Sequence, residues 1–263
     1  MNLKQCFLTE NECYKICKKH EIKGLMLHST GANNPNLRRY ISPDDGLLGT
    51  PSSNHWNQFR PNGRQVCVHG FIGKLKDETI ASYQTLPWDI AGWHSGSGTK
   101  GSANFMGYIG IEICEDDLTD KVYFEKVYKE AVELFAYLCN EYNLNPLKNI
   151  ICHSEGYKLS IASNHADVMH WFARHNKNMD IFRDDVNKEL SIIKHEKWYK
   201  VKVQFGAFKD KEKALTLKKK LENEGYYVVI DEESNQIVDM LEITKQITEK
   251  IKYKLIDMIE SEL

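Results

Sequence analysis

The sequence predicts an α/β protein in which helices flank a central mixed β-sheet, followed by a small C-terminal α+β domain. Predicted strands and helices alternate along residues 1–193, and a charged run over 194–197 separates them from a strand–helix–strand unit within 198–263. A chain of 263 residues is long enough to bury the core of one large domain and one small domain. We therefore expect two domains, residues 1–193 and 198–263.

The first sixty residues predict a helix, a strand and a long loop. A capping-box pattern that starts at Thr9, with apolar residues at helical spacing behind it, predicts a short helix that ends near His20. The apolar stretch 22–28 predicts a strand that ends at His28. The stretch from there to Asn62 is rich in Asn, Pro, Gly and Ser, which indicates a long loop of the kind that usually carries function.

The middle of the chain predicts three strands and a long helix. Alternating or continuous apolar residues predict strands over 66–73, 80–86 and 108–114, and Glu112 lies on the opposite face from the isoleucines of the last strand. Residues 121–142 carry an apolar stripe with a period of 3.6 residues, which predicts an amphipathic helix.

The first domain is expected to close with a strand, a loop and a helix. A short buried strand is predicted over 149–152, an irregular loop over 153–172 and a helix over 181–193.

The second domain is predicted to contain a strand over 198–205, a helix that ends before Gly225 and a strand over 226–230. From Ile243, isoleucine and leucine recur every four residues, which predicts one long amphipathic helix from about Gln236 to the end of the chain. We expect this helix to pack on the small sheet. The alternative is that it packs on another copy of itself and forms a homo-oligomer.

Composition and charge exclude several classes of protein. The formal net charge is -2, so there is no general electrostatic reason to expect nucleic-acid or anionic-membrane binding. The apolar runs are too short to insert across a membrane, and no apolar signal-peptide core follows Met1, so we expect synthesis in the cytoplasm. The seven cysteines are scattered, which favours reduced structural thiols over a disulfide framework.

Two histidines and an aspartate are candidates for a hydrolytic metal site. Such a zinc site needs three protein ligands, an open position for water and an acid/base group beside it. His28 and His153 both end predicted strands, and Asp167 follows in the next loop. With ten histidines in the chain, spacing alone is weak support for this set.

Five short blocks in a fixed order are more specific than any single motif. They are Leu27–Thr30 (LHST), Val68–Ile72 (VHGFI), Ala91–Gly96 (AGWHSG), Ile109–Ile113 (IGIEI) and Cys152–Glu155 (CHSE). In this order they resemble the type 2 N-acetylmuramoyl-L-alanine amidases, the superfamily that includes the peptidoglycan recognition proteins. The resemblance covers roughly residues 5–193 and implies the amidase fold.

The resemblance implies a role for several residues. His28, His153 and Asp167 match the three zinc ligands of the family, and Glu112 matches its general base. The family's lysine two positions before the third ligand is replaced here by His165, to which we assign stabilisation of the oxyanion. His165 could itself be the third ligand, although the spacing of the family block favours Asp167.

The same resemblance implies a substrate and partner. Trp93 and His94 lie in a family block and are expected to contact substrate, although a structural role for His94 is equally compatible with the sequence. The implied reaction is zinc-dependent hydrolysis of the amide bond between N-acetylmuramic acid and L-alanine in bacterial peptidoglycan, with Zn²⁺ as cofactor. This reaction suits a phage endolysin or an autolysin that acts on the cell wall after release.

Residues 198–230 resemble the first half of a SPOR repeat, a small cell-wall-binding fold, so the second domain is expected to bind the wall or to mediate oligomerisation. Two alternatives remain for the whole chain. One is a non-catalytic peptidoglycan-binding protein, which would lack a zinc ligand. The other is a cytosolic amidase that recycles muropeptides, which would not need residues 198–263.

Overall fold

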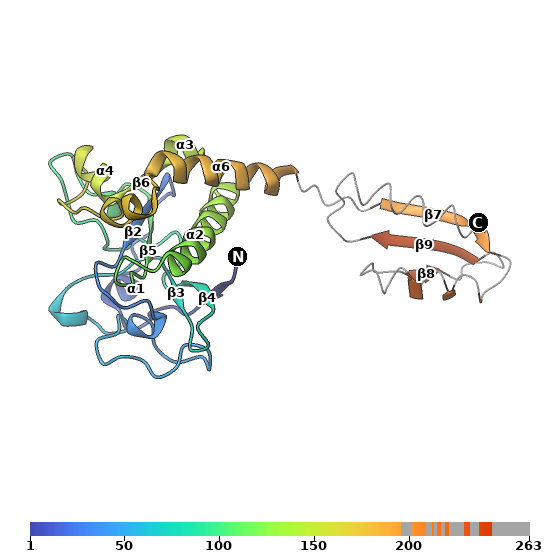
Figure 1. Cartoon of the computed structure of the whole chain (residues 1–263), viewed down its shortest axis with the longest axis horizontal. Helices are drawn as coiled ribbons and strands as arrows, with labels where there is room; N and C mark the ends of the chain where they lie inside the picture. The colour runs from blue at the N-terminus through green and yellow to red at the C-terminus, as the bar shows by residue number, and fades with distance from the viewer. Residues whose placement is uncertain are drawn as a thin grey trace. The chain divides into compact units, whose positions relative to one another are not determined.

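The computed structural model comprises two compact units, Met1–Ser191 and Ile192–Leu263, each with a sheet of its own (Figure 1). The division between the two units falls inside the helix α6 (Met179–His195). The residues that the structure describes are 1–195, 201–208, 212, 215–216, 219–220, 229–231 and 237–243.

The first unit is built on a six-stranded sheet with the strand order β1-β4-β3-β5-β2-β6. Within this sheet β3 and β4 are antiparallel and all other neighbours are parallel, so the predicted mixed sheet is confirmed. Its strands are β1 (Leu3–Gln5), β2 (Gly24–Ser29), β3 (Gly70–Lys74), β4 (Ile80–Gln84), β5 (Tyr108–Ile113) and β6 (Ile150–Cys152).

Helices flank this sheet, as predicted. The long helix α2 (Lys121–Glu141) contacts β3 and β4, and the short helix α4 (His153–Lys158) contacts β2 and β6. Phe182 of α6 packs on α2 through Tyr128 and Phe135, with ring centroids 5.6 and 5.2 Å apart. The remaining helices are α1 (Glu12–Ile16), α3 (Pro146–Asn149) and α5 (Met169–Phe172), with 3₁₀ turns at Leu37–Arg39, Pro61–Gly63, Ala103–Phe105 and Ala173–His175.

The first helix is shorter than the sequence predicts, and a different residue caps it. Asn11, rather than Thr9, accepts a hydrogen bond from the backbone N–H of Cys13, at 3.0 Å. The helix ends at Cys17, whose φ of 52° lies in the left-handed region and cannot continue a right-handed helix. All seven cysteines are free thiols.

The predicted irregular loop over 153–172 is also corrected, because it contains the helices α4 and α5. The Glu155 carboxylate accepts a hydrogen bond at 3.1 Å from the backbone N–H of Cys152, which satisfies a donor at the start of α4. This helix is short and polar, so it leaves no apolar periodicity in the sequence. The strand β1 was not predicted; it pairs parallel with β4.

The second unit contains a three-stranded antiparallel sheet with the order β7-β9-β8. Its strands are β7 (Val201–Phe208), β8 (Val229–Asp231) and β9 (Ile237–Ile243). The described residues between β7 and β8, which are 212, 215–216 and 219–220, are helical, in agreement with the predicted helix.

The prediction of one long helix from Gln236 is wrong for residues 237–243, which form the central strand β9. Several of these residues are β-branched, which favours a strand, and β9 gains backbone hydrogen bonds on both sides from β7 and β8. Residues 244–263 lie outside the described residues, so self-association through a helix there stays a prediction. Among the helices that the structure describes, none has both the length and the apolar character needed to cross a bilayer.

Candidate active site

The topology of the sheet brings His28 and His153 together. His28 is the fifth residue of β2, all of whose residues are buried, and His153 is the first residue of α4, directly after β6. The strands β2 and β6 lie side by side (Figure 1) and are parallel neighbours with Leu27 opposite Cys152. Both histidines therefore lie at the same end of the sheet. Ligands in α/β proteins bind at this carboxyl edge.

Asp167 completes a compact group of three metal-binding side chains. Its Oδ2 lies 3.1 Å from Nδ1 of His28 and 3.5 Å from Nδ1 of His153, and the two histidine Nδ1 atoms are 3.1 Å apart. Zinc bonds of about 2.0–2.1 Å in a tetrahedral site place neighbouring donor atoms roughly 3.3–3.4 Å apart. Two imidazoles and one carboxylate with these separations fit one zinc ion.

The charges of these groups suit a cation. Burial would raise the pKa of the Asp167 carboxyl, but the neighbouring side chains of His153 and His28 hold that pKa well below its ordinary range. Burial lowers the pKa of His28, with Asp167 opposing the shift, so the imidazole tends to be neutral. An ionised carboxylate beside a neutral imidazole is the protonation state that a divalent cation requires.

Glu112 lies beside this group on β5, opposite His28 in the strand register. Its Oε2 is buried and has no hydrogen-bond partner among the described residues. Burial raises the pKa of this carboxyl well above its ordinary value, and the negative charges of Asp167 and Glu115 raise it further. A buried carboxylate oxygen without a partner is costly, so the position of Glu112 in a cleft indicates a chemical role.

His165 lies outside the group of three donor atoms. Its exposed ring stacks on His153, with ring centroids 4.6 Å apart and planes inclined by 28°. The geometry therefore places Asp167, rather than His165, with the two histidines. His165 lines the same cleft, where its ring can meet a bound substrate.

His94 and Trp93, the predicted substrate contacts, both line the cleft. Trp93 packs edge-on against Phe105, with ring centroids 5.6 Å apart. The His94 ring turns toward the ligand group, because its Nδ1 lies 2.9 Å from Nε2 of His28. His69 lies outside the cleft wall and is fully buried.

The cleft has a volume of about 620 Å³. Two residues that the sequence did not single out also line it. Arg64 is exposed and has no ion-pair partner among the described residues, and His170 pairs with Glu115 at 2.9 Å. Neither residue lies in a block with a recognisable pattern, so no sequence signal marks them. Trp56 of the long loop lines the cleft as well.

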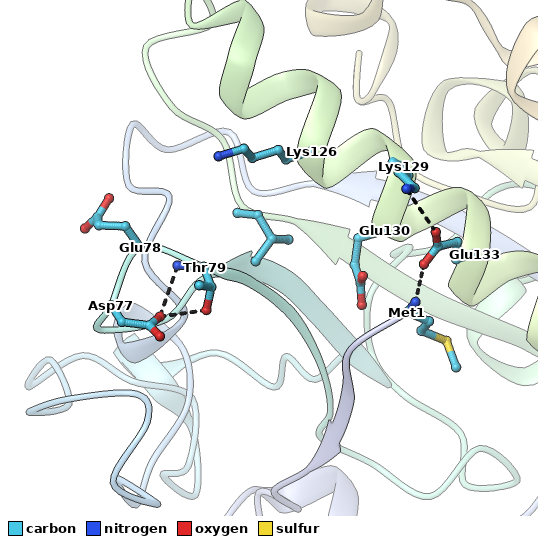
Figure 2. A pocket seen from close by; sticks show the side chains of 9 residues that line it. Met1, Asp77, Glu78, Thr79, Lys126, Lys129, Glu130 and Glu133 are labelled. Carbon is cyan, nitrogen blue, oxygen red and sulfur yellow. Dashed lines mark hydrogen bonds and ion pairs between the residues drawn. The ribbon is translucent and has the colours of Figure 1, made fainter. Parts of the chain in front are cut away.

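Figure 2 shows a second groove, of about 600 Å³, between the β3–β4 turn and α2. Its carboxylates are satisfied by neighbouring groups. Glu133 pairs with the amino group of Met1 and lies 3.8 Å from Lys129, and Glu130 accepts hydrogen bonds from the backbone of Asn2 and from Ser82. The residues that line it include no histidine or cysteine.

Comparison with known proteins identifies the family. Residues 18–180 match the family model described as N-acetylmuramoyl-L-alanine amidase, which covers more than half of the chain. This chain belongs to the N-acetylmuramoyl-L-alanine amidase family. Residues 199–240 match the model of the SPOR domain.

The individual relatives of this amidase-family chain are distant or cover it in part. It is 44% identical over 73 residues to the N-acetylmuramoyl-L-alanine amidase CwlH of Bacillus subtilis (strain 168), a match that covers 28% of this chain and 27% of CwlH. Its fold resembles that of the Staphylococcus aureus hydrolase AmiA, with a TM-score of 0.50 and 16% identity over 74% of this chain and 84% of AmiA. The PlyG catalytic domain gives a TM-score of 0.50 and 19% identity over 72% of this chain and 96% of that domain. These two likenesses support the predicted fold.

Proposed function

We propose that this protein is a zinc-dependent amidase that hydrolyses the bond between the lactyl group of N-acetylmuramic acid and L-alanine in bacterial peptidoglycan. The observation that carries the proposal is the meeting of His28, His153 and Asp167 beside Glu112, whose buried Oε2 has no partner among the described residues. Family membership supplies the substrate class.

In this proposal, His28 and Asp167 hold the zinc ion together with His153. The bound ion supplies a Lewis acid for the scissile carbonyl and lowers the pKa of water to about 7. Glu112 accepts a proton from the attacking water and later donates it to the leaving amine. Its raised pKa suits a group that must both take and return a proton near neutral pH.

His165 is proposed to donate a hydrogen bond to the oxygen of the tetrahedral intermediate. Its exposed ring stacks on His153 and lines the cleft, where it can reach a bound substrate. Trp93 and Trp56 offer aromatic faces on which a sugar ring or a peptide can pack.

The second unit is proposed to hold the enzyme on the cell wall, on the strength of its match to the SPOR domain model. A role as phage endolysin or autolysin, with synthesis in the cytoplasm and action on the wall after release, belongs to the same proposal. Deleting residues 198–263 should then reduce hydrolysis of intact wall more than hydrolysis of a soluble muropeptide. Equal losses on both substrates would count against a targeting role.

The reaction itself is tested by mass spectrometry of purified sacculi after digestion by the full chain. The proposal predicts free L-alanine amino termini on the released peptides and intact glycan strands. Binding to sacculi without any released peptide would instead indicate a non-catalytic peptidoglycan-binding protein.

A further inference from the structure

We infer that His94 and Ser163 are positioning residues that fix the ring tautomers of the two zinc histidines. This inference rests on the proposed zinc site. Each of the two residues accepts a hydrogen bond from the outer nitrogen, Nε2, of one ligand and thereby leaves Nδ1 of that ligand without a proton. Asn104 fixes the backbone of His94 and Ser95, on which both contacts depend.

The first contact is a chain of two hydrogen bonds through His94. Nε2 of His94 lies 3.3 Å from the carbonyl oxygen of Tyr108, which can only accept, so this nitrogen carries the proton. Nδ1 of the neutral His94 ring is then an acceptor, and it lies 2.9 Å from Nε2 of His28. His28 must donate through Nε2, which leaves its Nδ1 free to face His153 and Asp167.

The second contact repeats this logic for His153. The hydroxyl of Ser163 donates to the carbonyl oxygen of Ser95 at 3.2 Å and is therefore available as an acceptor. It lies 3.3 Å from Nε2 of His153. His153 thus donates through Nε2 as well, and its Nδ1 faces the same point as that of His28.

Asn104 ties the two contacts together. Its buried side-chain oxygen accepts hydrogen bonds from the backbone N–H groups of His94 and Ser95, at 2.8 and 3.0 Å. One side chain therefore fixes both the residue that contacts His28 and the carbonyl that orients Ser163.

Two glycines make room for this arrangement. A Cβ on Gly110 would lie 2.5 Å from the His94 ring, so only glycine lets that ring rest on β5. Gly96 has a φ of +62°, and a Cβ there would lie 2.6 Å from the hydroxyl of Ser163. Both glycines stand in the sequence blocks that surround the site. Packing of His94 and Ser163 therefore explains these glycines, which bind no metal themselves.

The hydrogen bonds at Nε2 matter because Asp167 favours a proton on Nδ1 of the same ring. Its carboxylate lies close enough to accept a hydrogen bond from Nδ1 of His28, which would block that nitrogen from binding a metal. An acceptor on the other side of the ring favours the opposite tautomer. Outer contacts of this kind typically change metal affinity by about 10–100-fold.

The test measures zinc affinity of the full chain by competition with a chromogenic chelator, with Zn²⁺ alone as the probe. His94→Leu removes the acceptor and should weaken zinc binding by about 10–100-fold. His94→Asn places an amide oxygen near the position of Nδ1 and should restore most of that affinity. Ser163→Ala, which removes only a hydroxyl, should weaken binding in the same direction and guards against a folding defect in the His94→Leu variant.

The matched control is His20→Asn. His20 stacks on His69, with ring centroids 6.0 Å apart, and contacts none of the three proposed ligands, so its replacement should leave zinc affinity unchanged. Circular dichroism confirms that each variant is folded before its affinity is compared.

The second readout is nuclear magnetic resonance of the zinc-loaded chain labelled with ¹⁵N-histidine. We expect a scalar coupling across the hydrogen bond between Nε2–H of His28 and Nδ1 of His94, which is lost in His94→Leu. Wild-type zinc affinity in folded His94→Leu and Ser163→Ala, or His28 binding zinc through Nε2, would overturn this inference. A wild-type chain that does not bind zinc would instead overturn the proposed function.

Discussion

The two grooves of the first unit are nearly equal in size, about 620 Å³ at the candidate active site and about 600 Å³ beside α2, but they differ in how their charges are compensated. In the groove beside α2, Glu133 and Glu130 each have a cation or hydrogen-bond donors at hand (Figure 2). At the candidate site, Glu112 is half-buried, and its buried Oε2 has no hydrogen-bond partner among the described residues.

The volume of a groove therefore does not by itself identify the reactive site of this protein. Satisfied ion pairs on a surface contribute little to stability, and they leave no group in need of a ligand. A carboxylate with an unpaired buried oxygen, beside two imidazoles and an ionised aspartate, is unfavourable until a cation and a substrate occupy the site.

The largest expected contrast comes from removing one carboxylate from each groove. Glu112→Gln should lower kcat/KM by at least about 10²–10⁴-fold, because a general base is lost. Glu130→Gln is the matched control and should leave kcat/KM unchanged. Release of peptide from sacculi, measured with both variants under identical conditions, checks this prediction. Comparable losses in the two variants would remove the distinction between the grooves.

Glu112→Gln should also change the stability of the zinc-free protein. The folded-state pKa of Glu112 is raised, so its protonated form stabilises the fold at low pH and this contribution is lost as pH rises above the ordinary value of 4.5. Glu112→Gln should therefore increase the free energy of unfolding of the zinc-free protein at neutral pH and have little effect near pH 4. Urea unfolding at several pH values measures this. A destabilised Glu112→Gln variant at neutral pH would contradict the account.

Zinc should stabilise the wild-type protein by binding at the candidate active site and not in the groove beside α2. A ligand at 1,000 times its Kd adds about 4 kcal/mol to the free energy of unfolding. Asp167→Ala should abolish most of the zinc-dependent rise in Tm, whereas Glu133→Ala should retain it. Thermal unfolding with and without zinc provides the measurement, and an unchanged rise in Asp167→Ala would show that zinc binds elsewhere.

A smaller effect is expected on the acidic limb of the pH–rate profile. Activity requires ionised Glu112, so kcat/KM falls as pH drops through its raised pKa. The negative charge of Glu115 contributes to that raised pKa, so Glu115→Gln should move the acidic limb to lower pH. A limb that stays in place, or moves to higher pH, would argue against Glu112 as the base.

The smallest effect is expected from the surface cations of the two grooves. Arg64 lines the candidate site without an ion-pair partner and is placed to meet a substrate carboxylate. Arg64→Ala should raise KM about 2- to 5-fold with little change in kcat, as expected for an exposed ion pair. Lys126→Ala, in the other groove, should change neither constant. Steady-state kinetics on a soluble muropeptide distinguishes the two.

Local patterns predicted the elements that hold the ligands. The helix α2 followed from its 3.6-residue period, and the strand ends that carry His28 and His153 followed from short apolar runs. Their meeting required parallel pairing of β2 with β6, which no local pattern contains. Asp167 came from the family pattern rather than from spacing.

Other features depend on contacts between distant segments. The strand β9 was mistaken for a helix because the four-residue repeat of isoleucine and leucine begins at its last residue, Ile243, and the predicted helix was extended back over the strand. The contact of His94 with His28 joins residues that are 66 positions apart, so the sequence marked His94 as part of a block but not as a partner of a ligand.

The central claim is that one zinc ion, held by His28, His153 and Asp167, is required for the reaction. The most direct test strips the purified full chain with a chelator and restores zinc stepwise while peptide release from sacculi is followed. The account predicts loss of activity on chelation and full recovery at one zinc per chain. Undiminished release after complete removal of metal would contradict it.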